Sequence, residues 1–257
     1  MHTLYLLYTV STTLPNAATG RIHVARANEV VTVTLDHPER GNEVSVGMFE
    51  ALAEVLRSEA EAPSAKALVL RGAGGTFCTG RERVATDLAG MREEAMRLIT
   101  LKRALRATPL ITVARVHGAA TGFGMGLAML CDFAIVAEDA PLQFPEMRMG
   151  LPPAAIMAYL GEYALPRHVF PLVLFGDPFT ARHAKEIGLV SDVVAGADLD
   201  AAVEALITRI VAIDGASARA CKELFQTMLQ GSFDANCRLA ADALPVASAT
   251  LIHRPVR

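Results

Sequence analysis

The amino-terminal part of the chain alternates apolar and polar residues and then changes to a helical period. Residues 22–24 and 30–35 predict two paired strands around a turn at Ala27 and Asn28. Ser45 can cap a helix, and apolar residues then recur at helical spacing over residues 46–56. Residues 66–71 predict a buried strand that ends in a glycine-rich turn.

The strand-and-helix pattern continues along the chain. Helical spacing returns over residues 88–106 and ends before Pro109, and a strand over residues 110–116 leads through a second glycine-rich turn into a helix of small residues. Another strand follows over residues 133–137, and beyond Pro152 the pattern is mostly helical, apart from a short apolar segment at 188–194. We therefore predict an α/β core over residues 1–196 and a helical carboxyl-terminal region over residues 197–257.

The first twenty residues remain open to three interpretations: an extra strand, a flexible leader or a misassigned start codon. Their apolar run is short and lacks a basic lead-in, which argues against a signal peptide. No run in the chain approaches the length needed to cross a bilayer, so a membrane is not an expected partner.

Charge and cysteine content narrow the function further. The net charge of −3 argues against nucleic acid as the main partner, because phosphate binding needs a basic surface. The cysteines at 78, 131, 221 and 237 lie far apart, and neither they nor the histidines have metal-ligand spacing. Cys131 lies in an apolar run and is expected to be buried and reduced, which favours a cytoplasmic location.

Two glycine-rich turns carry the candidate chemistry. Neither has the spacing of a dinucleotide-binding turn, and the Walker and G-x-S-x-G patterns are absent. The turns can instead present two backbone N–H groups, at Arg81 and at Phe123, and two convergent donors form an oxyanion hole. On spacing alone, two tight structural turns explain the pattern better, because glycine turns are common.

Several motifs in order resemble one family over almost the whole chain, the crotonase or enoyl-CoA hydratase/isomerase superfamily. The loop LDHPERGN (35–42), the segment LVLRGAGGTFCTG (68–80) and the segment HGAATGFGMGLAMLCD (117–132) are similar to its first three motifs. FPEMRMGLP (144–152) and ARHAKEIGLV (181–190) resemble later ones. The resemblance implies a ClpP/crotonase-like α/β fold, a spiral of ββα units with a carboxyl-terminal helical trimerisation region.

The same resemblance implies a ligand and an assembly. It implies an acyl-CoA thioester whose carbonyl oxygen is held by the N–H groups of Arg81 and Phe123, with no metal or redox cofactor. It also implies a homotrimer or hexamer. Arg40 and Lys222 are candidate contacts for CoA.

The departures from the family pattern decide the expected chemistry. Hydratases of this family use two glutamates to hold and activate water; this chain has one, Glu146, and Gly126 stands at the position of the other. We expect Phe144, Met147, Met149 and Leu151 to wall a dry pocket that raises the pKa of Glu146. Without the resemblance, Glu146 would be interpreted as a surface glutamate.

Three further positions carry open alternatives. The Phe123 ring is expected to narrow the acyl pocket. Arg81 can pair with an acidic acyl group and Glu82 can serve as a secondary acid, but a solvated helix start is the favoured interpretation of both. His117 and Asp132 are expected to be structural.

The basic residues of the 88–106 helix predict a solvated face that can also meet CoA phosphates. These residues are Arg92, Arg97, Lys102, Arg103 and Arg106.

These observations predict enoyl-CoA isomerisation with Glu146 as the single acid/base. The alternatives are a hydratase with a relocated second acid, another acyl-CoA lyase or hydrolase, and a catalytically silent acyl-CoA-binding oligomer.

Overall fold

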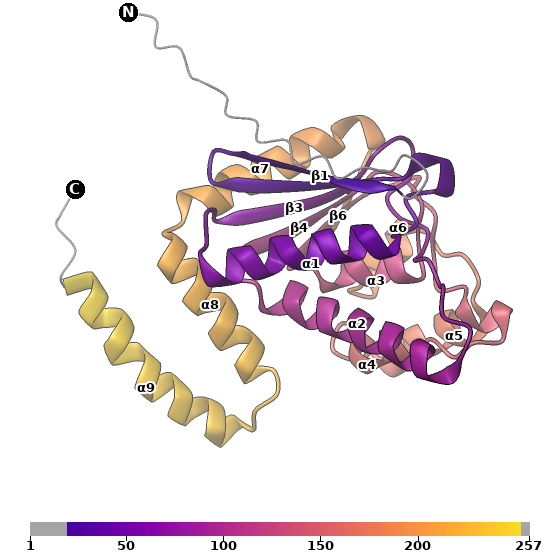
Figure 1. Cartoon of the computed structure of the whole chain (residues 1–257). Helices are drawn as coiled ribbons and strands as arrows, with labels where there is room; N and C mark the ends of the chain where they lie inside the picture. The colour runs from indigo at the N-terminus through magenta and orange to yellow at the C-terminus, as the bar shows by residue number, and fades with distance from the viewer. Residues whose placement is uncertain (1–19, 253–257) are drawn as a thin grey trace, which may run out of the picture. The chain divides into compact units, whose positions relative to one another are not determined.

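The computed structural model describes residues 20–252 and divides the chain into two compact units, with the boundary after Val211. The interpretations of the first twenty residues therefore lie outside the described residues, except at Gly20. Figure 1 shows the elements of the first unit. They are β1 (Arg21–Ala27), β2 (Val30–Asp36), η1 (Pro38–Arg40), α1 (Val46–Glu61), β3 (Ala67–Gly72), α2 (Leu88–Ala107), β4 (Ile111–Val116), β5 (Ala120–Thr121), α3 (Phe123–Leu130), β6 (Phe133–Ala137), β7 (Leu142–Gln143), η2 (Glu146–Met149), α4 (Ala154–Leu160), α5 (Pro166–Phe175), α6 (Ala181–Glu186), β8 (Asp192–Val194), η3 (Gly196–Asp198) and α7 (Leu199–Ala212, whose last residue lies beyond the boundary).

A six-stranded sheet forms the centre of this unit, in the order β1-β2-β3-β4-β6-β8. β1 and β2 form the predicted hairpin and pair antiparallel, whereas the remaining neighbours pair parallel. Asn28 and Glu29 at the hairpin turn both adopt positive φ. The parallel strands need crossover connections, and helices α1, α2 and α3 lie within these connections.

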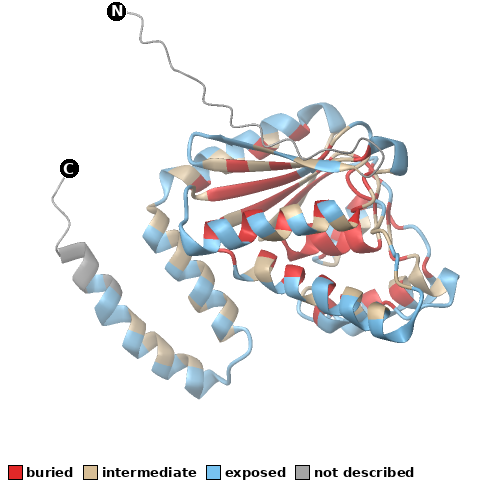
Figure 2. Ribbon diagram, viewed as in Figure 1, coloured by how far each residue is buried: buried red, intermediate tan, exposed pale blue. Residues whose placement is uncertain are grey.

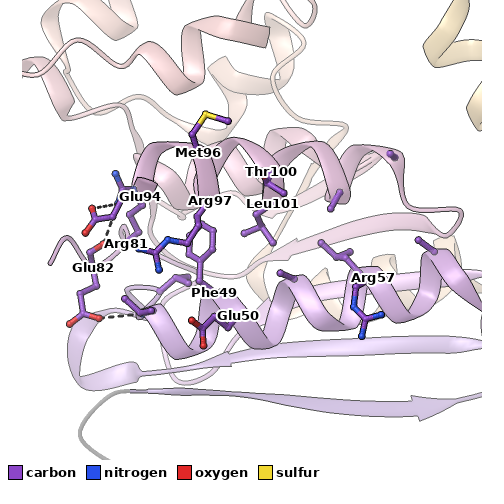
Figure 3. Close-up of a pocket in the computed structure, with 17 residues that line it drawn as sticks. Phe49, Glu50, Arg57, Arg81, Glu82, Glu94, Met96, Arg97, Thr100 and Leu101 are labelled. Atoms are coloured by element: carbon purple, nitrogen blue, oxygen red, sulfur yellow. Dashed lines mark hydrogen bonds and ion pairs between the residues drawn. The ribbon is translucent and has the colours of Figure 1, made fainter. Parts of the chain in front are cut away.

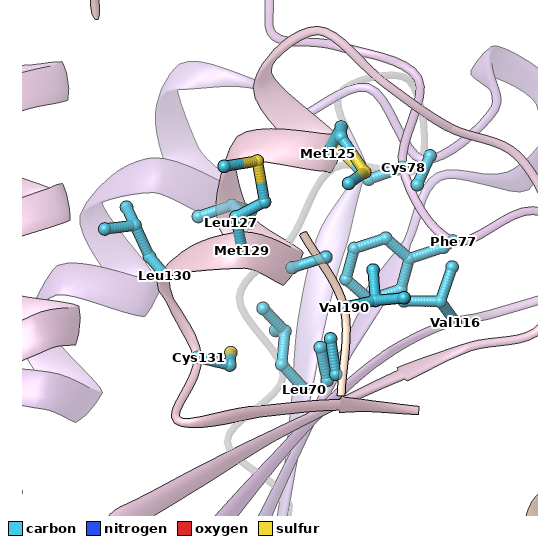
Figure 4. Packing of buried hydrophobic residues seen from close by; sticks show 14 of the residues in the cluster. Leu70, Phe77, Cys78, Val116, Met125, Leu127, Met129, Leu130, Cys131 and Val190 are labelled. Atoms are coloured by element: carbon cyan, nitrogen blue, oxygen red, sulfur yellow. The ribbon is translucent and has the colours of Figure 1, made fainter. Parts of the chain in front are cut away.

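Helices cover both faces of the central sheet. Figure 1 shows α1 and α3 on one face and α7 on the other, and Figure 2 shows that the buried residues gather in the strands and in α3. Every residue of α3 is buried. Its residues Met125 and Met129 pack with Phe77 and Val116 in the hydrophobic core (Figure 4). The predicted α/β core is confirmed.

The predicted boundary at residue 196 is too early. Residues 196–198 form η3, which leads directly into α7, and α7 buries Leu199, Val203 and Ile210 in the core of the first unit. The Lys66 ammonium group also donates to the Val211 carbonyl at 2.8 Å. A helical pattern alone could not separate a helix that packs on the sheet from the helices that follow it.

The second unit contains α8 (Gly215–Met228) and α9 (Phe233–Ile252). Asp214 caps α8 by accepting from the Ser217 N–H at 3.0 Å. The Asn236 side chain donates to the Met228 carbonyl at 2.8 Å and ties the two helices at their connection. Within residues 20–252, no helix is long and apolar enough to cross a membrane.

Candidate active site

Three short segments that follow the carboxyl ends of β3, β4 and β6 pair with one another. Residue 78 pairs with β5, and β5 pairs with β7, in parallel register. Each segment is followed, three or four residues later, by one residue of the predicted site, and these are Arg81, Phe123 and Glu146. Parallel pairing runs all three segments in the same direction, so the three residues leave the same end of this small sheet.

A glycine allows the second and first segments to approach. A Cβ at Gly124 would overlap the carbonyl group of Cys78, so only glycine fits where α3 begins. Beside it, the Thr121 N–H donates to the Cys78 carbonyl at 3.0 Å, and the Thr121 hydroxyl donates to the Thr79 carbonyl at 2.8 Å. The glycine-rich pattern thus serves a backbone-to-backbone contact.

The backbone N–H of Arg81 is left without a protein acceptor. Its neighbours pair with Val44: the Val44 N–H donates to Gly80 at 3.0 Å, and the Glu82 N–H donates to Val44 at 2.9 Å. Arg81 lies between Gly80 and Glu82, so in this bridge its own N–H points away from Val44. Within the described part of the chain, it donates no hydrogen bond.

Phe123 is the first residue of α3, where the backbone N–H has no partner inside the helix. No hydrogen bond from this N–H occurs among residues 20–252, so it faces outward at the positive end of the helix dipole. The Phe123 ring is 6% exposed and stacks on Phe49 of α1 at 5.4 Å between centroids. The Phe123 ring therefore packs against the Phe49 ring.

Glu146 lies against the start of α3. A Cβ on Gly122, which has φ of 51°, would lie 3.1 Å from Oε1 of Glu146. Oε2 is buried and has no hydrogen-bond partner among the described residues. Burial raises the pKa of Glu146, while the charges of Arg83 and Lys102 act in the opposite direction. The predicted direction of the pKa shift is confirmed.

The predicted walls of this pocket are only partly correct. Phe144 is buried, but Met149 is 57% exposed and Leu151 is also exposed. Residues 146–149 form the 3-10 helix η2, which ends at Gly150 with φ of 71°, so Met149 is the last residue of this helix and Leu151 lies beyond its end.

Lys102 does not belong to a solvated helix face. It is 5% exposed, and its ammonium group donates to the Tyr159 hydroxyl at 2.9 Å and to the Ala155 carbonyl at 3.1 Å. Arg92, Arg97 and Arg103 are exposed as predicted, while Arg106 pairs with Glu162 at 2.7 Å. The spacing contained a signal that we missed, because position 102 lies in the same helical stripe as buried positions 98, 101 and 105.

Glu82 and Arg81 hold the loop that precedes α2, which begins only at Leu88. A solvated helix start is therefore the wrong description of both residues. Glu82 accepts from the Val46 N–H at 3.3 Å at the start of α1. The Arg81 guanidinium pairs with Glu94 at 3.4 Å. The acid role of Glu82 and the anion-binding role of Arg81 stay predictions.

A cavity of about 630 Å³ lies between α1 and α2. Figure 3 shows Arg81, Glu82 and Glu94 together at one end of it, with Phe49 pointing upward between the two helices. Its lining is otherwise mostly apolar or small, and includes Val44, Ala53, Leu56, Met96, Leu101 and Ala104. One end of the cavity is therefore charged and includes Arg81, whose N–H is a candidate for the oxyanion hole, whereas its interior is mostly apolar.

The two CoA-contact candidates belong to different units. Arg40 is exposed and pairs with Glu43 at 2.6 Å. Lys222 lies on α8. Both CoA contacts stay predictions.

The predicted structural residues make the expected contacts. Asp132 accepts from both the N–H and the hydroxyl of Thr112, at 2.7 and 2.9 Å. The His117 ring lies 2.9 Å from the Gly74 carbonyl. Asn42 is fully buried and donates to the carbonyls of Ala73 and Thr76 at 2.8 and 2.6 Å, which fixes the turn that leads toward Arg81. Cys131 is buried, as expected, and forms no disulfide among the described residues.

The sheet, its covering helices and the paired turns define a protein of the crotonase fold. A crystal structure of enoyl-CoA hydratase from Mycobacterium smegmatis is 29% identical, covers 90% of this chain and 91% of its own, and superposes with a TM-score of 0.85. A Thermobifida fusca protein assigned as an enoyl-CoA hydratase and solved in complex with CoA is 28% identical, covers 95% of this chain and 100% of its own, and gives 0.82. The predicted fold class is confirmed.

The family model described as enoyl-CoA hydratase/isomerase matches residues 25–244, and the chain belongs to this family. The echA6 protein of Mycobacterium tuberculosis, assigned as an enoyl-CoA hydratase, is 38% identical over 133 residues. That match covers 51% of this chain and 52% of the relative, so the chain spans about half the length of the mycobacterial proteins it matches. A Thermus thermophilus protein with the same assignment is 31% identical over 220 residues, 82% of this chain and 86% of the relative.

Proposed function

We propose that the protein isomerises a 3-enoyl-CoA thioester to the 2-enoyl-CoA thioester, with Glu146 as the only acid/base. The carrying observation is a single desolvated carboxyl group, Glu146, beside the amino terminus of α3, with no second carboxylate at Gly126. A carboxylate whose pKa is raised toward neutrality is suited to moving a proton in both directions.

The proposed reaction moves one proton and one double bond. The Glu146 carboxylate removes a proton from C2, and the C2–H electrons form the C1–C2 double bond of a dienolate as the carbonyl electrons move to the thioester oxygen, while the C3–C4 double bond stays in place. The N–H groups of Arg81 and Phe123 donate to that oxygen. Glu146 then returns the proton to C4, the carbonyl re-forms, and the double bond lies between C2 and C3. These steps use no metal or redox cofactor.

We place the acyl chain of the substrate in the cavity between α1 and α2. Its apolar lining suits a hydrocarbon chain, and Arg81, the residue proposed to bind the thioester oxygen, lines one end. The lining positions on α2 from Arg97 to Ala107 span about 15 Å of helix, enough for an extended medium-length chain. CoA contacts at Arg40 and Lys222 and a cytosolic homotrimer or hexamer belong to the same proposal.

The test uses purified protein in heavy water with 3-enoyl-CoA esters of increasing chain length and, separately, a 2-enoyl-CoA ester. We expect deuterated 2-enoyl ester from the first and no water addition to the second, read by mass spectrometry and NMR. Glu146→Gln should reduce turnover by about a hundredfold to ten-thousandfold, because the general acid/base is lost. Arg148→Gln, at an exposed residue two positions away, is the matched control.

Hydration remains the second candidate because the named relatives carry that assignment. A 3-hydroxyacyl product would favour it and would make Glu82 the next residue to change. Tight binding of both esters without turnover, unaffected by Glu146→Gln, would identify a silent acyl-CoA-binding protein. Full turnover by Glu146→Gln would show that the assignment of Glu146 is wrong.

A further inference from the structure

The space beside Gly126 on α3 is already filled by two polar groups from other helices. A Cβ at this position would lie 2.7 Å from the Tyr159 hydroxyl oxygen and 3.3 Å from the Lys102 ammonium nitrogen. Real Cβ atoms essentially never approach a heavy atom as closely as the first distance. The family resemblance places a second carboxylate here, and this chain has an ammonium group and a phenol instead.

The Lys102 ammonium group is held in one place. It donates to the Tyr159 hydroxyl and the Ala155 carbonyl, and its nitrogen lies 4.7 Å from the centre of the Tyr159 ring. Tyr159 in turn donates to the carbonyl of Gly126 at 3.3 Å. Lysine is almost never this deeply buried unless it is paired, and a fixed buried cation is a candidate for a functional role.

Lys102 and Glu146 border the same turn of α3. Glu146 lies beside Gly122, which immediately precedes α3, and Lys102 borders Gly126, whose N–H donates to the Gly122 carbonyl at 3.0 Å. Oε2 of Glu146 is buried without a hydrogen-bond partner in the described part of the chain. A carboxylate in that environment becomes protonated unless a cation compensates for the lost solvation.

We propose that Lys102 is a positioning residue for Glu146: its fixed ammonium group keeps Glu146 ionised as the base in the water-poor site. This inference rests on the proposed acid/base role of Glu146. Besides Lys102, Arg83 favours the ionised form of Glu146, and Arg81 and Tyr159 are the other charged or titratable groups near this pair. Burial lowers the pKa of Lys102 to about 8, so the ammonium form predominates at neutral pH.

The sign of the pH effect follows from this arrangement. Removing the cation leaves burial as the main influence, so the pKa of Glu146 rises and the acidic limb of the pH–rate profile moves to higher pH. Activity on the acidic limb should therefore fall, by about tenfold at most for each pH unit that the limb moves, and recover as the pH is raised.

The experiment compares Lys102→Met, Lys102→Arg and the control Arg103→Met at the adjacent exposed residue. The acidic limb of kcat/KM for 3-enoyl-CoA isomerisation should move only in Lys102→Met, while Lys102→Arg keeps the charge and the position of the limb. Circular dichroism confirms that each variant is folded. The pKa of the Glu146 carboxyl, followed by ¹³C NMR, gives the same comparison without turnover.

The two proposals fail in different ways. A folded Lys102→Met protein with an unshifted Glu146 pKa would overturn the positioning role and leave Lys102 as a structural donor to Ala155 and Tyr159. Full turnover by Glu146→Gln overturns the proposed function instead, while the NMR titration still decides whether Lys102 controls the ionisation of Glu146.

Discussion

At the scale of single residues, Gly126 stands where the family resemblance places a carboxylate, and its neighbours leave no room for a side chain. The Tyr159 hydroxyl and the Lys102 ammonium group occupy the volume that a side chain there would need. Restoring the family's second glutamate by one substitution would therefore add a side chain to a filled space. It would also pair the new carboxylate with Lys102 rather than with a water molecule.

We predict that Gly126→Glu creates no hydratase. The added side chain should lower the free energy of unfolding by about 1–3 kcal/mol, because it overpacks the region between α3 and α4. Hydration of a 2-enoyl-CoA and chemical denaturation provide the two measurements. Gly161→Glu is the control, since a Cβ at Gly161 meets nothing within 4 Å. Efficient hydration by a fully stable Gly126→Glu protein would contradict this account of the site.

The candidate site was predictable from sequence only where motif and chemistry coincide. Glu146, Arg81 and Phe123 follow motifs whose order indicates the family. The direction of the Glu146 pKa shift was predicted correctly, but two of the apolar neighbours from which it was predicted, Met149 and Leu151, are exposed. The burial of Lys102 was missed because a charged residue among arginines was assigned to solvent. Its partner Tyr159 comes from α4, and no local pattern connects positions that are 57 residues apart.

At the scale of elements, the long strands and helices were predicted well because each carries its own period. Ser45 caps α1, as expected, by accepting from the Met48 N–H at 3.3 Å. The two-residue strands β5 and β7 carry no period and exist only through pairing between distant segments. Yet these short strands align the candidate residues, so the active-site geometry was the part least accessible to sequence patterns.

A carboxylate on α2 fixes the loop that presents the Arg81 N–H. Glu94 accepts from the N–H groups of Val84 and Ala85 at 2.9 and 2.6 Å and pairs with the Arg81 guanidinium. Burial opposes ionisation of Glu94, but these donors together hold its pKa below the usual value. Glu94 therefore remains ionised at neutral pH and ties residues 81–85 to the helix.

Removing this tie should loosen the loop. We predict that Glu94→Ala increases amide hydrogen exchange over residues 81–87 and lowers kcat about tenfold to a hundredfold, as the Arg81 N–H loses its alignment. Glu93→Ala changes the exposed neighbouring residue and should have neither effect. Unchanged exchange in Glu94→Ala would show that the loop is held by its pairing with Val44 alone.

At the scale of the whole molecule, the second unit exposes large apolar side chains. Phe225, Leu229 and Phe233 are 64%, 55% and 80% exposed, and Leu244 and Val246 are exposed as well. Phe225 and Leu229 lie four residues apart and share one face of α8. Apolar surface of this kind is typical of interaction sites, which agrees with the prediction from the family resemblance that the carboxyl-terminal helices mediate trimerisation.

We predict that the protein assembles as a homotrimer or hexamer through this unit. Light scattering coupled to size-exclusion chromatography should give a multiple of three times the 27.3 kDa chain mass. Phe225→Asp combined with Leu229→Asp should reduce that mass, because burying two carboxylates at an interface is unfavourable. Glu223→Gln, on the same helix, should leave it unchanged. If the unaltered protein has the mass of one chain at all concentrations, the apolar face serves another partner and the trimer prediction is wrong.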